Sequence, residues 1–382
     1  MACEVEWIPL GDIVNLSSGG TPDKKQPAYW DGEIPWISAK TLTGDTVTTS
    51  NLFITEEGLH AGSKLAPVGS ILLLTRGSGL FKRIPLAIVN APVAYNQDVK
   101  CMTSKVTTIT NEYVFFALKA LSPELTNMLE TTGIGAGKLA TDRLLDMPIP
   151  VLSHDEREKA VSFFSALSRK IMINNRINDY LADFASTVFQ NQASHIEERI
   201  ALFDIADIKY GKGLAKNELV EDGYPVFGGN GQIGFYSKYL YEEPQILISC
   251  RGAASGKVLV SLPKSFITSN SLIIELKDRR YYEYLKQYFM LHQLYDYATG
   301  SAQPQITIDG LRHLTVPYPP FDLIKTLTNQ LKAISDCIYS NDIENQALSR
   351  LRDTLLPKLM SGEIDVSKVD LTQLTNNHLT VR

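Results

Sequence analysis

The sequence predicts an α+β fold in which two mixed α/β domains alternate with two long helices. Two long stretches match each other at an offset of 167 residues, and the apolar residues of both follow the same heptad spacing. The rest of the chain consists of short apolar runs separated by turns that contain glycine or proline. We therefore expect five segments, at residues 1–152, 153–196, 197–319, 320–360 and 361–382.

The first mixed domain is expected at residues 1–152. The run Ile71–Leu74 is fully apolar and continues into Thr75-Arg76-Gly77, which predicts a buried strand that ends in a loop. Residues 112–118 are expected to form an amphipathic helix. A glycine-rich segment follows at residues 132–138.

The first long helix is expected to begin at residue 153 or 155, because Ser153 and Asp155 are both suitable N-caps. Apolar residues recur in both helices at alternating spacings of three and four, which places one apolar seam along each helix. The coinciding pairs are Ala160/Leu327, Phe164/Leu331, Leu167/Ile334, Ile171/Ile338, Leu181/Leu348 and Val188/Leu355.

Both helices interrupt this seam with asparagine at the same heights. Asn174 coincides with Asn341, and Asn178 coincides with Asn345. A buried asparagine in such a seam commonly fixes pairing and register. The alternative is a solvated asparagine on a helix with a wider apolar face. Because both positions coincide, we favour these four residues as register residues of paired helices.

The second mixed domain is expected at residues 197–319. Ile246–Ser249 followed by Cys250-Arg251-Gly252 repeats the buried strand and its exit, and Glu283-Tyr284-Leu285 repeats Glu112-Tyr113-Val114. Loop lengths differ between the two domains, whereas the offset between the helices is constant. This pattern is expected if the domains bind two different targets while the helices hold a distance.

Composition excludes several classes of protein. With 382 residues, 44% hydrophobic content and no apolar run of membrane-spanning length, the chain resembles a soluble protein. The start Met1-Ala2-Cys3-Glu4 lacks the features of a signal peptide, so we expect a cytoplasmic protein. The net charge of -5 disfavours binding of nucleic acid through bulk charge and leaves room for local basic patches.

The motifs that resemble nucleotide or metal sites fail on chemistry, so we expect no cofactor and no metal. Residues 133–138 and 252–257 lack the first glycine and the final Ser or Thr of a phosphate-binding loop. No acidic residue lies between Pro244 and Ile274 to complete a metal-dependent nuclease motif around Glu275.

A more serious alternative is an adenine methyltransferase. Phe227-Gly228-Gly229-Asn230-Gly231 fits the S-adenosylmethionine-binding pattern of such enzymes, but it lies in a turn without the required strand and helix. Tyr318-Pro319-Pro320-Phe321 resembles their catalytic motif, but Tyr318 replaces the side chain that would bind a flipped adenine. We expect a glycine-rich hairpin at residues 227–231.

Binding chemistry remains, because cationic and amide side chains gather in predicted loops. Lys and Arg suit phosphate contacts, and Arg, Asn and Gln suit base edges; the alternative is that these loops are simply solvated. The strongest candidates are Arg76 and Arg251, which follow the two buried strands. The full set of candidate DNA-binding residues is Thr21, Lys24, Lys25, Lys40, Arg76, Ser78, Lys82, Arg83, Gln97, Lys138, Lys212, Lys216, Asn230, Arg251, Ser255, Lys257, Asn270, Gln303 and Gln305.

The two long helices and the end of the second one carry a family resemblance. The chain closely resembles the specificity subunit of type I restriction-modification systems over about residues 4–366. The most specific part of this resemblance is the run from Arg352 through Leu355-Leu356-Pro357-Lys358-Leu359 to Ser361-Gly362-Glu363-Ile364. The resemblance implies two target-recognition domains, each contacting one half of a split DNA sequence. It also implies that the helices pair as an antiparallel spacer, with the domains related by a pseudo-twofold axis.

The resemblance further implies the partners. A specificity subunit has no catalytic activity, binds double-stranded DNA and recruits two methyltransferase subunits, which restriction subunits join. Antiparallel pairing would bring Asn174 and Asn341 together near the middle. Gly135-Ala136-Gly137 differs from Ala302-Gln303-Pro304, so the two domains need not contact DNA identically in that loop. The alternatives are a self-sufficient adenine methyltransferase and a purely structural adaptor.

Overall fold

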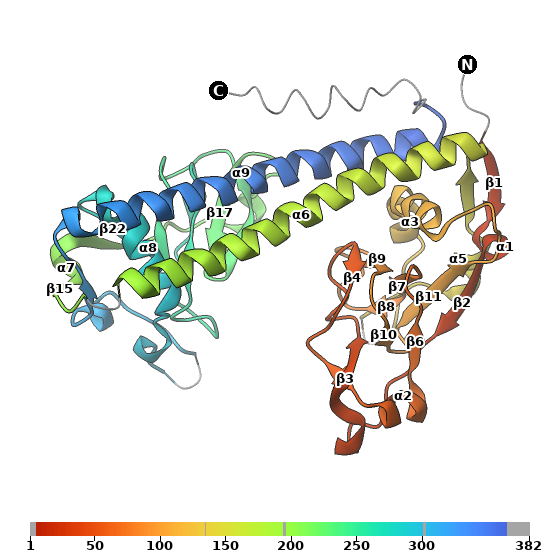
Figure 1. Cartoon of the computed structure of the whole chain (residues 1–382), viewed down its shortest axis with the longest axis horizontal. Helices are drawn as coiled ribbons and strands as arrows, with labels where there is room; N and C mark the ends of the chain where they lie inside the picture. The colour runs from red at the N-terminus through yellow and green to blue at the C-terminus, as the bar shows by residue number, and fades with distance from the viewer. Residues whose placement is uncertain (1–4, 134, 194–195, 301–302, 365–382) are drawn as a thin grey trace. The chain divides into compact units, whose positions relative to one another are not determined.

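A computed structural model describes residues 5–133, 135–193, 196–300 and 303–364 of the chain (Figure 1). The expected tail at 361–382 lies mostly outside these residues. The chain forms two compact units: unit 1 comprises Met1–Ile173 and Ile343–Arg382, and unit 2 comprises Asn174–Asp342. The boundary therefore falls inside both long helices. No helix within the described ranges combines the length and hydropathy needed to cross a membrane.

The main sheet of unit 1 has five strands, with the expected buried strand β7 (Ile71–Leu74) at its centre. The strand order is β2 (Val14–Ser18), β11 (Val99–Ser104), β7, β9 (Leu86–Val89) and β4 (Thr46–Val47). All four residues of β7 are buried. β4 runs parallel to β9, whereas the other neighbouring strands are antiparallel.

Smaller sheets and short helices complete unit 1. One sheet has the order β5 (Phe53–Ile54), β3 (Trp30–Ile37), β10 (Val93–Tyr95) and β6 (Lys64–Ala66); another has β12 (Glu130–Thr131), β13 (Gly137–Lys138) and β8 (Arg76–Gly77). β1 (Glu6–Pro9) pairs with β14 (Pro148–Val151). The short helices are α1 (Leu10–Ile13), α2 (Glu56–Gly62), α4 (Ser122–Asn127) and α5 (Thr141–Asp146).

The helix expected at residues 112–118 is α3 (Asn111–Ala120), but it is not amphipathic. Residues 113–118 are all buried, because the sheet and the long helices enclose the helix. Thr110 caps it by accepting a hydrogen bond from the Tyr113 N–H at 3.2 Å. The Tyr113 hydroxyl donates to the Pro150 carbonyl at 2.8 Å and accepts from the Leu152 N–H at 3.1 Å, which ties α3 to β14.

Unit 2 repeats the main sheet of unit 1 with one strand fewer among the described residues. Its main sheet has the order β16 (Ala206–Tyr210), β22 (Ser271–Leu276), β19 (Ile246–Ser249) and β20 (Val258–Val260). A second sheet has the order β18 (Gly231–Tyr236), β17 (Tyr224–Gly228) and β21 (Phe266–Ile267), and β15 (Arg199–Ala201) pairs with β23 (Thr315–Pro317). The helices are α7 (Leu202–Ile205) and α8 (Tyr282–Leu291).

The glycine-rich hairpin expected at residues 227–231 is confirmed. β17 and β18 pair antiparallel and are joined at Gly229-Asn230, with Gly231 at a φ of 124°. Glycine is the residue that adopts such a backbone without strain. A dinucleotide-type site needs a strand followed by a helix, and here a strand follows a strand.

The long helices are α6 (His154–Ala193) and α9 (Phe321–Met360), each of 40 residues. Ser153 precedes α6, and its hydroxyl lies 2.7 Å from the Glu156 carboxylate to which it donates. In unit 1 the start of α6 packs on the end of α9, and in unit 2 the end of α6 packs on the start of α9. The helices are therefore paired antiparallel, as expected for a coiled coil.

The seam asparagines pair differently from the expectation. Asn341 donates to the Asn178 side-chain carbonyl at 2.8 Å, and Asn178 donates to the Asp342 carboxylate at 2.8 Å. Asn341 thus meets Asn178, which lies one helical turn from Asn174 on α6. Asn174 is buried, with 1% of its surface exposed. The solvated alternative is therefore wrong for Asn174.

Candidate nucleic-acid interface

In unit 1 the exit of β7 brings two candidate cations together. Arg76 on β8 lies opposite Lys138 on β13, and both side chains are exposed. Thr75 anchors the exit, because its hydroxyl donates to the Asp98 carbonyl at 3.0 Å and its own carbonyl accepts from the Leu139 N–H at 2.8 Å. The short β8–β13 ladder therefore presents a positive pair at the end of a buried strand.

A second loop of unit 1 joins this region through Gln97. The Thr21 hydroxyl and the Gln97 side-chain carbonyl are 2.6 Å apart, and Gln97 immediately precedes Asp98. Lys24 and Lys25 follow Thr21 in an exposed turn. The candidate residues Thr21, Lys24, Lys25 and Gln97 thus form one connected surface.

Tyr95 supports this surface from below. Its hydroxyl lies 2.7 Å from the Ser17 hydroxyl, and its carbonyl accepts from the Gly20 N–H at 3.0 Å. Burial raises the pKa of Tyr95 to about 12, so it stays neutral at physiological pH. A side chain on Gly19 would meet the Tyr95 carbonyl at 1.9 Å, which explains glycine at this close approach.

Unit 2 places an equivalent pair at the exit of β19. Arg251 and Gln305 form an antiparallel bridge, at the place where unit 1 pairs Arg76 with Lys138. The Gly252 N–H donates to the Pro304 carbonyl at 2.9 Å and the Ile306 N–H donates to the Cys250 carbonyl at 3.1 Å. The two exits share a backbone arrangement, and an amide replaces the lysine.

The β17–β18 hairpin lies beside this exit. Lys257 donates to the Asn230 side-chain carbonyl at 2.9 Å. A side chain on Gly229 would meet the Ser249 hydroxyl at 2.9 Å and the Asn270 carbonyl at 3.1 Å, so the hairpin turn rests on the end of β19. Lys212 is joined to the same region, because the Ser269 N–H donates to its carbonyl at 3.0 Å.

The remaining candidate residues are placed less decisively. Among the described residues, several candidates are exposed and have no contact that joins them to either exit. They are Lys40, Ser78, Lys82, Arg83, Lys216 and Gln303. Ser255 is buried, and its hydroxyl donates to the Pro304 carbonyl at 2.7 Å. We assign Ser255 the role of holding the 303–305 loop in place.

Phe81 was not among the residues singled out from the sequence. Its side chain is 48% exposed, and one of its ring carbons would lie 3.4 Å from a side chain placed on Gly137. Exposed aromatic rings beside cations are suited to stacking on bases. The signal in the sequence was an aromatic residue directly before Lys82-Arg83 in the loop that follows Gly77-Ser78-Gly79.

These features define a class of protein: a tandem α+β repeat in which each repeat presents a polar, partly cationic loop cluster and contributes to a pair of long helices. No group of three or more metal-ligating side chains lies within the described ranges.

A family model for the type I restriction modification DNA specificity domain matches residues 4–182 and 198–351. The chain belongs to this family.

Individual relatives carry the same description. The chain is 24% identical over 410 residues to the MjaIX type I restriction enzyme specificity subunit of Methanocaldococcus jannaschii, covering 94% of this chain and 93% of that protein. It is 31% identical over 193 residues to the EcoR124I/EcoR124II specificity subunit of Escherichia coli, a match that spans 47% of this chain and 48% of that relative. The crystal structure of the S subunit from M. genitalium shares the fold, with a TM-score of 0.56, 18% identity and coverage of 94% and 96%.

Proposed function

We propose that this chain is the sequence-specific DNA-recognition subunit of a type I restriction-modification complex, without catalytic activity of its own. The observation that carries the proposal is the pair of equivalent strand exits, one per repeat. Each exit holds an arginine beside a second polar side chain, Lys138 in one case and Gln305 in the other. Arginine suits both phosphate oxygens and guanine edges, and glutamine suits adenine edges.

The differences between the two exits support recognition of a bipartite target. Unit 1 presents a positive pair together with the lysines at 24 and 25, whereas unit 2 presents an arginine, an amide and the Asn230–Lys257 contact. Two surfaces of the same backbone but different chemistry suit two different half-sites. We assign residues 1–152 to one half and 197–319 to the other.

The paired helices suit a spacer and a platform for partners. Their equal lengths of 40 residues would fix the gap between the half-sites. We infer that two methyltransferase subunits and the restriction subunits assemble on this chain, in the cytoplasm. The net charge of -5 fits such partners, because they would supply part of the charge that neutralises the DNA phosphates.

The test is an exchange of residues 1–152 for the corresponding segment of a relative, in cells that also express the methyltransferase subunit. Adenine methylation mapped across the genome should change in one half of the recognised sequence and keep the other half and the gap. An unchanged methylation map would favour a structural adaptor and overturn the assignment.

A separate measurement addresses the methyltransferase alternative. Isothermal titration of the isolated chain with S-adenosylmethionine should show no binding, because residues 227–231 form a hairpin turn. Asn230→Ala is the matched variant for this measurement, since Asn230 is exposed at that turn. Binding that Asn230→Ala abolishes would support a self-sufficient enzyme.

A further inference from the structure

The two main sheets end differently at equivalent edges. In unit 1 the strand β4 lies beyond β9, with Thr46 opposite Ile88 and Val47 opposite Val89. In unit 2 the equivalent strand β20 is the last of its sheet, and no strand of the described residues 196–300 and 303–342 lies beyond it. An open strand edge presents backbone groups that can pair with another chain.

Hydrogen bonds show which backbone groups face this edge. In unit 1 the Ile88 N–H donates to the Asp45 carbonyl at 2.9 Å, and the Asn90 N–H donates to the Val47 carbonyl at 2.7 Å. Val260 occupies the place of Ile88, since Ile246 opposes Val260 as Ile71 opposes Ile88. The Val260 N–H therefore points away from β19, with no β4 equivalent to accept it.

One outward group of β20 is already satisfied. The Val258 N–H donates to the Gln293 side-chain carbonyl at 2.7 Å. This contact blocks the first residue of the edge. The part that stays open begins at Val260 and continues through Ser261 and Leu262, and these three residues line a groove.

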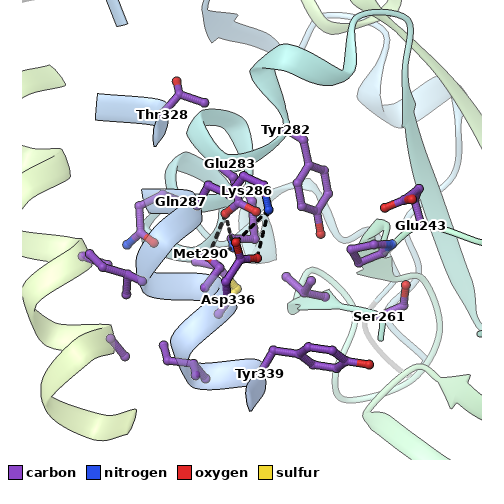
Figure 2. Close-up of a pocket in the computed structure, with 18 of the residues that line it drawn as sticks. Glu243, Ser261, Tyr282, Glu283, Lys286, Gln287, Met290, Thr328, Asp336 and Tyr339 are labelled. Atoms are coloured by element: carbon purple, nitrogen blue, oxygen red, sulfur yellow. Dashed lines mark hydrogen bonds and ion pairs between the residues drawn. The ribbon is translucent and has the colours of Figure 1, made fainter. Parts of the chain in front are cut away.

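The groove has a volume of about 1050 Å³ and lies wholly within unit 2. Figure 2 shows Tyr282, Lys286 and Met290 of α8 around it, with Ser261 at the sheet edge. This volume is at the upper end of the roughly 300–1000 Å³ of small-molecule pockets, and the groove is open, which favours a longer occupant. Tyr282 is 7% exposed, and its hydroxyl has no hydrogen-bond partner among the described residues.

The first unit shows what lies in the equivalent place. There the Asp45 carboxylate, at the start of β4, is 2.5 Å from the Lys119 ammonium and 2.6 Å from the Arg352 guanidinium. The residues equivalent to Lys119 and Arg352 in the repeat are Met290 and Ala185, and both line the groove. The second unit has thus replaced two cations with apolar side chains.

Three of the four cations that line the groove are ion-paired, Arg280 with Asp278 and the two lysines as follows; the fourth, Arg279, donates to the Pro244 carbonyl at 3.0 Å and lies over the Tyr282 ring. Lys286 forms an ion pair with Glu283, whose carboxylate also accepts from the Ser335 hydroxyl at 2.8 Å. Lys332 lies 2.8 Å from Asp336. An acidic segment would have to compete with these contacts, whereas an apolar one would cover Met290, which is 45% exposed.

We propose that the open edge of β20 binds an extended segment of a partner polypeptide. The segment runs parallel to β20, as β4 runs parallel to β9, and accepts hydrogen bonds from the Val260 and Leu262 N–H groups. An aliphatic side chain lies against Met290 and Ala185, where the first unit holds Asp45. Backbone pairing supplies affinity and the apolar contact supplies selectivity. This inference is independent of DNA recognition.

The test uses a fluorescein-labelled peptide of residues 43–49 carrying Asp45→Val, titrated with the full chain and followed by anisotropy. We expect this peptide to bind about tenfold more tightly than the peptide with native Asp45, because an unpaired carboxylate resists burial. Val260→Pro removes one outward N–H from an edge strand that tolerates proline, and should weaken binding about fivefold. Val260→Ala keeps the N–H and trims the same side chain, so Val260→Pro should bind the peptide more weakly than Val260→Ala does.

Met290→Lys is the decisive variant, because it restores a cation at the position of Lys119. It should reverse the preference, so that the native Asp45 peptide binds more tightly than the Asp45→Val peptide. Equal binding of both peptides to every variant would overturn the proposal, as would no binding at millimolar peptide. A chain that dimerises by sedimentation, with Val260→Pro abolishing the dimer, would identify a second copy as the occupant and overturn the assignment to a partner.

Discussion

At the scale of single residues, the two exits differ in the side chain beside a common arginine. Arg76 lies across from Lys138, and Arg251 lies across from Gln305. Guanidinium groups bind guanine edges and phosphates in a bidentate manner, which the single ammonium of lysine does not reproduce. We therefore expect the chemistry of one residue pair to set what each exit prefers.

Arg76→Ala should weaken DNA binding by the complex with its methyltransferase subunit by about 1–3 kcal/mol, and relax selectivity in one half-site only. Arg251→Ala should do the same in the other half-site. The matched controls are Arg76→Lys and Arg251→Lys. If the arginine contacts phosphate, the lysine variant should bind DNA more tightly than the alanine variant. If the arginine contacts a base, the lysine variant should still show relaxed selectivity. Fluorescence titrations on DNA duplexes altered in each half provide the measurement, and equal loss on every duplex would contradict half-site assignment.

Tyr113 links stability to pH. Burial raises its pKa to about 12, from an ordinary value of 10. Between these values the unfolded chain releases the phenolic proton while the folded chain keeps it, so this contribution to stability is complete below pH 10 and falls as the pH rises toward 12. Tyr113→Phe should lower the free energy of unfolding at pH 8 by about 1–3 kcal/mol, because two hydrogen bonds are lost. Between pH 8 and pH 11 the free energy of unfolding should fall less for this variant than for the unmodified chain.

Urea unfolding at both pH values measures this difference. Tyr339→Phe is the control, because Tyr339 is 40% exposed and loss of its hydroxyl should change the free energy of unfolding little. A Tyr113→Phe variant with the full alkaline loss would contradict the assignment.

At the scale of elements, the long helices and the central strands follow from local pattern. The heptad seam predicts α6 and α9, and the apolar runs predict β7 and β19, because a burial pattern within one element is visible in consecutive residues. β4 was not predictable, since Thr46-Val47 has no pattern of its own and pairs through a parallel contact with β9. The burial of α3 on nearly every side was missed for the same reason: the groups that enclose it lie far away in sequence.

The register asparagines also show the limit of sequence pattern. The repeat superposes Asn174 on Asn341, but antiparallel pairing places Asn341 beside Asn178. The equivalence of the two exits was predictable from the repeat. The pairing of Arg76 with Lys138 was not, because it joins strands that are about 60 residues apart in sequence. Nonlocal contacts decide which of the candidate residues meet.

Asn178→Leu combined with Asn341→Leu should keep the helices paired and relax their register. A half-buried polar pair disfavours shifted pairings, which the leucines would tolerate. Disulfide trapping between cysteines introduced on α6 and α9 at two alternative registers measures the effect, with the unmodified pair of asparagines as reference. Trapping at only the native register in the double variant would contradict a register role.

At the scale of the whole molecule, unit 1 is built from two distant parts of the chain, whereas unit 2 is one continuous segment. Leu356, Leu359 and Met360 lie in the same core cluster as β7 and α3, although more than 200 residues separate them. Leu356 is 2% exposed. The core that supports β7 and α3 therefore includes the last turns of α9.

Leu356→Ala should destabilise unit 1 by about 2–5 kcal/mol, because it leaves a cavity in this core. Leu323→Ala is the matched control on the same helix, since Leu323 is 77% exposed and should cost less than about 0.5 kcal/mol. Hydrogen exchange of the β7 amides reports on unit 1, and that of the β19 amides reports on unit 2. Faster exchange is expected in β7 and not in β19, and equal acceleration of both would contradict the division into units.

The contribution of α9 to the first core has a consequence during synthesis. At about 5–20 residues per second, the ribosome needs roughly 10 seconds or more to extend the chain from the end of the first domain to Met360. During that interval the apolar residues of α3 and of the first half of α6 lack the α9 side chains that cover them in the folded unit. Because the α9 residues that complete the core of unit 1 are made after those of unit 2, we expect unit 1 to complete its core after unit 2, although its synthesis begins first.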